Sequence, residues 1–437
     1  MRFSLLAIAA AALCPFAPAI GDGAFPDELS VMLPENVPNE ILLGTNFGLV
    51  ISQDQGKSWR YVCEPYITGS VNDNVNFYQA AKNGTVIATS FNGFWRSEDG
   101  GCTWTRAGGS AALVARDLFI DANDPLFVVA IAANLSAGRA DEVRVSHDGG
   151  ITFQGPVYST PNRLSGVEIA RSDRNVVYVT EISDDPRAAA EAFLLTSLDG
   201  GQTFDAVNRV QLPVPPGTEV TIAAVDPKLA GTVYLRLQNG PQRSDAIAVT
   251  TDRGATLTTA LTITGTTAFS TFLIAADGTL LAGTTSSDLY AAVAGTTAFQ
   301  KRTGPRARCL GQRAGDAAAP IYACGDGFLD GYNLGISIDG AQTFTPLMKF
   351  TDIAGPLTCP AVTQACAAQF ALLQQTLGVA PPPPPPPSSG GGGGGSPAKP
   401  GCSSAEAGGA VLLVALFAVL SPSLRGRRRQ SPGRSRA

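Results

Sequence analysis

A short motif that recurs at nearly constant spacing constrains the fold of this chain more than any other feature. It reads Ser/Thr-x-Asp-x-Gly-x-Thr/Ser followed by an aromatic residue. Six copies occur, with the aspartates Asp54, Asp99, Asp148, Asp199, Asp252 and Asp339. The first five aspartates are separated by 45, 49, 51 and 53 residues. A repeat of roughly 20 to 50 residues indicates stacked copies of one supersecondary unit, so we expect an array.

The spacing of the last two aspartates leaves room for a seventh unit. Asp252 and Asp339 lie 87 residues apart, and residues 292–299 between them keep the final aromatic but have lost the aspartate. Four short apolar-rich runs surround each copy, and in the first unit these are residues 28–33, 40–45, 48–52 and 58–63. Four short strands form one propeller blade. The sequence therefore predicts an all-β fold, a seven-bladed β-propeller over residues 25–350.

The motif has a structural explanation that requires no ligand. An aspartate in a tight turn accepts hydrogen bonds from backbone amides a few residues ahead, and glycine supplies the left-handed backbone of the reversal. The terminal Trp or Phe is expected to pack between neighbouring sheets. The composition agrees, because 48 of 437 residues are Gly and only 15% are charged, which is typical of turns and short half-buried strands.

These repeats resemble Asp boxes, also called BNR repeats. Residues 25 to about 350 are similar to the Asp-box propellers of sialidases, xyloglucan hydrolases and sortilin-like receptors. The resemblance implies that the boxes lie at the periphery of the blades. Because propellers support both enzymes and binding proteins, function has to be argued from a site. We expect a ligand in the central funnel, at the blade ends opposite the boxes.

Residues suited to catalysis are scarce. The only histidine, His147, lies inside the third repeat, which argues against a Ser/His/Asp triad and a histidine metal centre. The early Arg-Ile-Pro element that sialidase resemblance implies is absent, since residues 24–50 contain no arginine. Two-carboxylate glycoside hydrolysis stays open. Its candidates outside the repeats are Asp117, Asp121, Glu142, Glu168, Glu181, Asp226 and Asp326. No catalytic, cofactor-binding or metal-binding residue is assigned, and no cofactor is expected.

The predicted function is therefore binding. We expect a non-catalytic, surface-displayed propeller that binds or presents to an extracellular glycan or protein. The alternative is a sialidase-like or xyloglucanase-like glycoside hydrolase acting on extracellular polysaccharide. The formal charge is −5 and no basic stripe precedes the last 13 residues, which argues against nucleic acid as a partner. We expect a monomer.

Both ends of the chain indicate export. Residues 1–19 have the basic start, apolar run and small-residue site of a signal peptide that signal peptidase removes. Residues 380–400 form a Pro/Gly-rich linker. Residues 401–437 combine Gly401 and Cys402 with a short apolar stretch and an arginine cluster.

This C-terminal tail resembles the MYXO-CTERM sorting signal of myxobacterial surface proteins. The resemblance implies membrane contact through the tail, then processing at Gly401 and Cys402 by a sortase-like intramembrane protease. The protein would be tethered at the outer membrane or cell surface, or released. The apolar run 410–420 is shorter than the roughly 20 residues of a spanning helix, which favours processing. A permanent transmembrane helix is the alternative.

Six cysteines remain once Cys14 in the signal peptide and Cys402 in the tail are set aside. Sequence alone leaves their pairing open. We favour the disulfides Cys309–Cys324, Cys359–Cys366 and Cys63–Cys102. A zinc site is the alternative, although the spacings do not fit and the exported compartment is oxidising. Residues 351–379 contain helix formers with apolar spacings of three and four, which predicts a disulfide-stapled helical cap.

Overall fold

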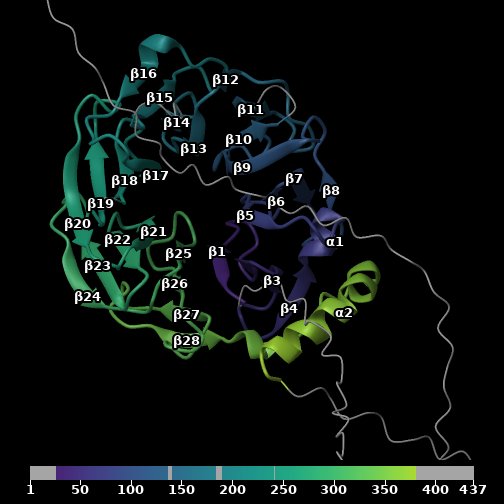
Figure 1. Ribbon diagram of the computed structural model, residues 1–437. Helices are drawn as coiled ribbons and strands as arrows, with labels where there is room; N and C mark the ends of the chain where they lie inside the picture. The colour runs from purple at the N-terminus through teal and green to yellow at the C-terminus, as the bar shows by residue number, and fades with distance from the viewer. Residues whose placement is uncertain (1–25, 136–139, 184–188, 241, 380–437) are drawn as a thin grey trace, which may run out of the picture. The chain divides into compact units, whose positions relative to one another are not determined.

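The computed structural model describes residues 26–135, 140–183, 189–240 and 242–379. These residues form a seven-bladed β-propeller, which confirms the predicted fold class (Figure 1). Each blade is an antiparallel sheet of four strands that are consecutive in the chain. The first strands of successive blades contact one another around the ring, and β25 of the last blade contacts β1 of the first. First strands are therefore innermost and fourth strands outermost.

The strand bounds follow chain order. Blade one contains β1 (Glu28–Met32), β2 (Ile41–Thr45), β3 (Gly48–Ser52) and β4 (Trp59–Cys63). Blade two contains β5 (Val75–Ala80), β6 (Val86–Ser90), β7 (Gly93–Ser97) and β8 (Thr105–Arg106). Blade three contains β9 (Leu113–Ile120), β10 (Val128–Asn134), β11 (Ala140–Ser146) and β12 (Tyr158–Thr160). Blade four contains β13 (Arg163–Ile169), β14 (Val177–Ile182), β15 (Ala192–Ser197) and β16 (Arg209–Gln211).

The last three blades repeat the arrangement. Blade five contains β17 (Glu219–Val225), β18 (Val233–Asn239), β19 (Ser244–Thr250) and β20 (Thr258–Thr264). Blade six contains β21 (Phe269–Ile274), β22 (Leu280–Thr284), β23 (Asp288–Ala292) and β24 (Gln300–Thr303). Blade seven contains β25 (Cys309–Gln312), β26 (Ile321–Cys324), β27 (Leu334–Ser337) and β28 (Thr345–Met348). The motif-less segment 292–299 thus begins at the end of β23, and residues 293–299 link β23 to β24.

The six motif copies form the turns between the third and fourth strands, here called the repeat turns. In the first, Ser52 Oγ donates to Asp54 Oδ1 at 2.9 Å and accepts from the Gly56 amide at 2.7 Å. Asp54 also accepts from the amide and hydroxyl of Ser58, at 2.9 and 2.6 Å. These two bonds lower the pKa of Asp54 to about 2. The side chains of Ser52 and Asp54 in the repeat turn therefore have hydrogen-bond partners within the turn, without a ligand.

Because strands alternate in direction, the repeat turns all lie on one face of the ring, here called the motif face. The blade-one register places Ile41 beside Ser52 at that face and Glu28 beside Thr45 at the other. The other face, here called the open face, carries the starts of the first strands and the turns between second and third strands. The expected ligand site belongs to the open face.

Replacing Asp99 with alanine tests the repeat turns. The change removes bonds from Ser97 Oγ and from the amide and hydroxyl of Thr103, at 3.0, 2.9 and 2.7 Å. Since water replaces part of these bonds, we expect the free energy of unfolding to fall by about 1 kcal/mol. Urea unfolding measures it. Asp277→Ala, in an exposed turn with one bond to the Thr279 amide, is the control. An equal loss in both variants would contradict a special role for the repeat.

The chain closes the ring by returning to blade one after blade seven. The 3-10 helix η2 (Phe350–Asp352) leads into β29 (Ile353–Pro356), which pairs in parallel with β4. Helix α2 (Pro360–Thr376) then packs against β4, β29 and the short helix α1 (Glu64–Thr68) (Figure 1). No described helix is long and apolar enough to span a membrane. A 3-10 turn, η1 (Ala206–Asn208), precedes β16.

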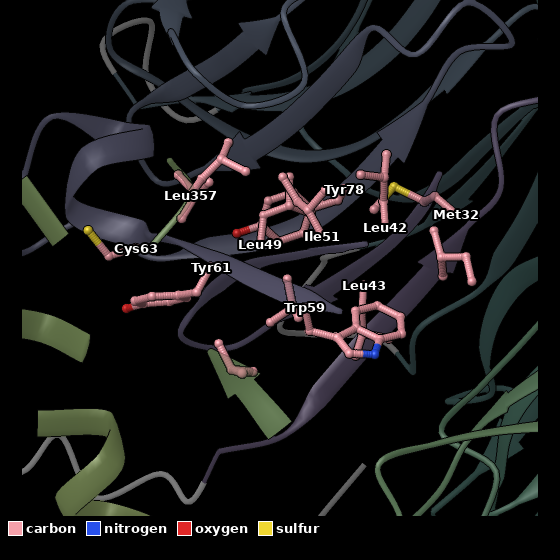
Figure 2. Packing of buried hydrophobic residues seen from close by; sticks show 14 of the residues in the cluster. Met32, Leu42, Leu43, Leu49, Ile51, Trp59, Tyr61, Cys63, Tyr78 and Leu357 are labelled. Carbon is pink, nitrogen blue, oxygen red and sulfur yellow. The ribbon is translucent and has the colours of Figure 1, made fainter. Parts of the chain in front are cut away.

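Blade one supplies a dense part of the core. Leu42, Leu49, Ile51 and Trp59 are at most 2% exposed. Tyr78 from blade two lies with Leu42, Leu49 and Ile51 on one face of the sheet, and Trp59 lies on the other face (Figure 2). From the returning segment, Leu357 and the helix residues Val362, Cys366 and Leu373 join the same cluster. Helix α2 is therefore bound by apolar contact as well as by covalent links.

The disulfides correct two of the predicted pairings. Cys309 and Cys324 are bonded as predicted, but Cys63 pairs with Cys366 and Cys102 with Cys359. The predicted pairs Cys359–Cys366 and Cys63–Cys102 were wrong. Cys359 is the N-cap of α2, so Cys366 lies about 10 Å along the helix axis, beyond the span of a disulfide. The helix is stapled to blades one and two instead of to itself.

Candidate functional site

A cavity among the described residues opens on the open face where blades seven and one meet. Its volume is about 290 Å³. Asp27 and Glu28 at the start of β1 form one wall, and Arg308 precedes β25. The loop between β26 and β27, the residues after β28, and Leu377 beyond α2 complete the lining. Segments about 300 residues apart in the chain meet there only because the ring closes.

Glu28 is the most unusual group in this cavity. Its side chain is almost fully buried, and its Oε1 atom has no hydrogen-bond partner among the described residues. Burial raises the pKa of Glu28 to about 9, against a hydrogen bond from Asn333 that lowers it, and the charge and hydrogen bond of Asp27 raise it further. Glu28 is therefore protonated at neutral pH. It lines the cavity as a buried, neutral carboxylic acid.

The groups around Glu28 are held in place by the turns that carry them. Asn333 Oδ1 accepts from the Phe350 amide at 2.8 Å, which directs its amide group toward Glu28. Asp27 forms an ion pair with Arg308, and its Oδ1 accepts from the Glu28 amide at 3.0 Å. The rim adds the exposed side chain of Lys349. The cavity thus combines fixed donors, fixed acceptors and two cations.

An aromatic side chain stands at the edge of the cavity. Phe328 lies in the turn between β26 and β27 and is 74% exposed. Asp326 fixes that turn, because its Oδ1 accepts from the amides of Phe328 and Leu329, both at 2.9 Å. The Asp326 carboxylate is thereby committed to the turn.

Of the seven acids singled out from the sequence, only Asp326 lines the cavity. Asp117 on β9 accepts from the Val167 amide of blade four, and Glu168 on β13 accepts from the Val225 amide of blade five. Burial raises the pKa of Asp117 to about 6 and that of Glu168 to about 8. These two acids therefore form hydrogen bonds between the first strands of neighbouring blades, from β9 to β13 and from β13 to β17.

The other four acids also have structural partners. Glu181 is fully buried and bonds Arg209 twice, at 3.0 Å each, and Tyr158 at 2.8 Å. Glu142 pairs with Arg144 at 2.8 Å. Asp121 and Asp226 cap the turns that follow their first strands. Among the described residues, no group of three or more His, Cys, Asp or Glu side chains could hold a metal ion.

Sequence reasoning missed the residues that form the cavity, apart from Asp326. Glu28 was included in an apolar run, although an acid inside such a run was a usable signal of a buried ionisable group. Asp27, Arg308, Asn333 and Lys349 carried no local signal. Gly401 and Cys402, the signal peptide and the linker lie outside the described residues.

Comparison with known proteins identifies the fold but not a family. No protein-family model matches the chain, and no curated protein matches it. An ancestral GH74 enzyme superposes with a TM-score of 0.52 at 14% identity, covering 74% of this chain and 46% of that one. This chain therefore spans about half of that enzyme. The likeness shows the propeller fold alone.

Two further solved structures are more distant. YCF48 from Cyanidioschyzon merolae gives a TM-score of 0.43 at 12% identity, with 69% of this chain and 95% of that chain covered. An oligogalacturonate lyase in complex with manganese gives 0.45 at 9% identity, with 61% and 74% covered.

Proposed function

We propose that this chain is an exported, surface-displayed propeller that binds an extracellular glycan in the cavity between blades seven and one, without catalysing its cleavage. The observation that carries the proposal is a cavity lined by the buried, neutral Glu28, whose Oε1 is unpaired among the described residues, together with Asn333, charged groups and Phe328. Sugar hydroxyls require such fixed donors and acceptors, and an exposed aromatic ring suits the apolar face of a pyranose.

The arrangement of the acids favours binding over hydrolysis. Glycoside hydrolases place two carboxyl groups about 5 to 9.5 Å apart, on either side of the scissile bond. Here the carboxyl groups of Glu28 and Asp27 hydrogen-bond to each other, which leaves no room for a glycosidic linkage between them. Asp27 is also paired with Arg308, and Asp326 is committed to its turn. Glycoside hydrolysis remains the alternative on the strength of the fold likeness to a GH74 enzyme.

Export and the family resemblance form part of the same proposal. The hydrogen bonding of the repeat turns supports their interpretation as Asp boxes. Three disulfides support an oxidising destination for the propeller. We propose sorting through Gly401 and Cys402 with surface tethering or release. Mass spectrometry of the exported protein, compared with a Cys402→Ala variant, tests the processing step, and normal processing of that variant would refute it.

Glycan retention by variants at the rim tests the binding proposal. We expect the exported chain to bind a subset of an immobilised glycan panel, and Phe328→Ala to weaken that binding about tenfold through loss of ring stacking. Phe91→Ala is the matched control, because Phe91 is 54% exposed in the corresponding turn of blade two. Release of new reducing ends by the wild-type chain, abolished in Glu28→Gln, would instead establish the hydrolase.

The pH dependence of stability tests the state of Glu28. Its folded pKa of about 9 lies above the ordinary 4.5, so the folded state holds a proton that the unfolded state releases. This stability is complete below about pH 4.5 and is lost as the pH rises toward 9. We expect a loss of roughly 2 to 3 kcal/mol between pH 5 and 7, with Glu168 adding in the same direction.

Glu28→Gln should remove the Glu28 part of this slope, because the amide cannot ionise, and should leave the part that Glu168 contributes. Urea unfolding across the pH range measures it. Glu98→Gln, at a carboxylate that is 66% exposed, should leave the slope unchanged. An unaltered slope in Glu28→Gln would mean that Glu28 is ionised in the folded protein.

A further inference from the structure

The outer edge of blade five differs from those of the other blades. The fourth strands β8, β12 and β16 have only two or three residues. β24 contains Lys301 and Arg302, and β28 contains Pro346. β4 is covered by β29. In contrast, β20 has seven residues, Thr258–Thr264, with neither a charge nor a proline.

Edge strands present unpaired backbone donors and acceptors. Proteins normally protect such edges by shortness, charge, proline, a bulge or a covering segment. Among the described strands β20 is paired only with β19. Its one such device is a bulge at Ala260, after which Leu261 to Thr264 pair regularly with β19. The outward edge of β20 is therefore suited to accept another strand.

We propose that β20 is a self-association strand, which pairs antiparallel with β20 of a second copy of this chain. The proline run of the chain's own linker cannot pair with the edge, because it lacks backbone donors. When β20 of a second copy pairs with β20 of the first, neither strand places a charged residue opposite a like charge. A twofold axis at Leu261 places Thr258 opposite Thr264 twice, and cross-strand threonine pairs are favourable.

The position of β20 permits this contact. Figure 1 shows β20 on the outer rim of the ring, so two rings can meet edge to edge. The cavity lies at blades seven and one, which are not neighbours of blade five, and it stays open in both copies. Seven residue pairs cover less surface than stable dimers do, so we expect a dissociation constant on the order of 10 to 100 µM. This inference departs from the monomer expected from the sequence.

Charge substitution at Thr262 tests the proposal. Thr262 is exposed and lies next to the proposed axis. Sedimentation velocity up to about 200 µM should show a monomer–dimer equilibrium for the wild type. Thr262→Lys and Thr262→Glu should each remain monomeric through like-charge repulsion, and an equimolar mixture of the two should dimerise again.

The controls separate association from folding. Thr303→Lys, at the end of the outer strand β24, should dimerise as the wild type does. Melting curves establish that each variant is folded, and recovery in the mixture cannot arise from misfolded chains. A wild type that stays monomeric at the highest concentration, or a Thr262→Lys variant that dimerises normally, overturns the proposal.

Discussion

Replacing both Cys63 and Cys366 with alanine is expected to lower the free energy of unfolding by about 4 kcal/mol. The bond joins residues 303 apart in sequence, and both cysteines are fully buried. Because Cys102–Cys359 already encloses most of this span, the loop that the bond closes consists of the 39 residues from Cys63 to Cys102 and the 7 from Cys359 to Cys366. A cross-link stabilises chiefly by restricting the unfolded chain, and the restriction grows with the logarithm of the enclosed loop. This bond also fixes α2 against blade one, so its loss weakens the closure of the ring.

The Cys309–Cys324 bond provides a control within the same protein. It links residues only 15 apart, on neighbouring strands of blade seven, so the loop-length argument gives about 3 kcal/mol. Equilibrium urea unfolding of both double-alanine variants under oxidising conditions measures the difference. Equal losses would show that loop length and ring closure contribute little beyond a local cross-link.

Ring closure has three separate components. Near the centre, Gly311 of β25 lies against Val31 of β1. On the motif face, the Arg313 guanidinium donates to the carbonyls of Pro38 and Glu40, at 3.1 and 3.2 Å. On the outside, β29, α2 and two disulfides bind the returning segment to blades one and two. Together they replace the covalent continuity that joins every other pair of neighbouring blades.

The sequence predicted the repeated blades. It could not predict which residues from distant parts of the chain come together to line the cavity. The spacing of the aspartates gave the number of blades, including blade six without its aspartate, because every blade needs the same four strands and turns. The cavity depends on contacts between β1 and residues about 300 positions later, such as Asn333 and Lys349. No local pattern encodes such a contact.

The cysteine pairings show a signal that was present but not used. Helix α2 starts at Pro360, and proline is favoured in the first helical turn. A helix from Pro360 would have placed Cys359 and Cys366 too far apart to bond. Their true partners, Cys102 and Cys63, depend on the returning segment lying against blades one and two, which sequence spacing does not determine.

Replacing Gly48 with alanine should cost about 4 kcal/mol of unfolding free energy. Gly48 has a φ of +141°, and a Cβ there would lie 2.0 Å from the Val62 carbonyl oxygen. The Val62 carbonyl is part of the backbone, so it cannot move aside as a flexible side chain can. Gly217→Ala is the control, because its φ of +81° is also left-handed but no atom lies within 4 Å of the added Cβ. We expect about 1 kcal/mol there from backbone strain alone.

Gly48→Ala and Gly217→Ala separate the effect of a close contact from that of backbone strain. The Cys63→Ala/Cys366→Ala variant connects the close contact at Gly48 to ring closure. Gly48 pairs with Cys63 in the sheet, so displacing the turn also displaces one end of the Cys63–Cys366 bond. Gly48→Ala should therefore cost less in the Cys63→Ala/Cys366→Ala background than in the wild type, because residues in contact are not additive. Urea unfolding of the four chains gives this coupling. Full additivity would mean that the close approach at Gly48 acts within blade one alone.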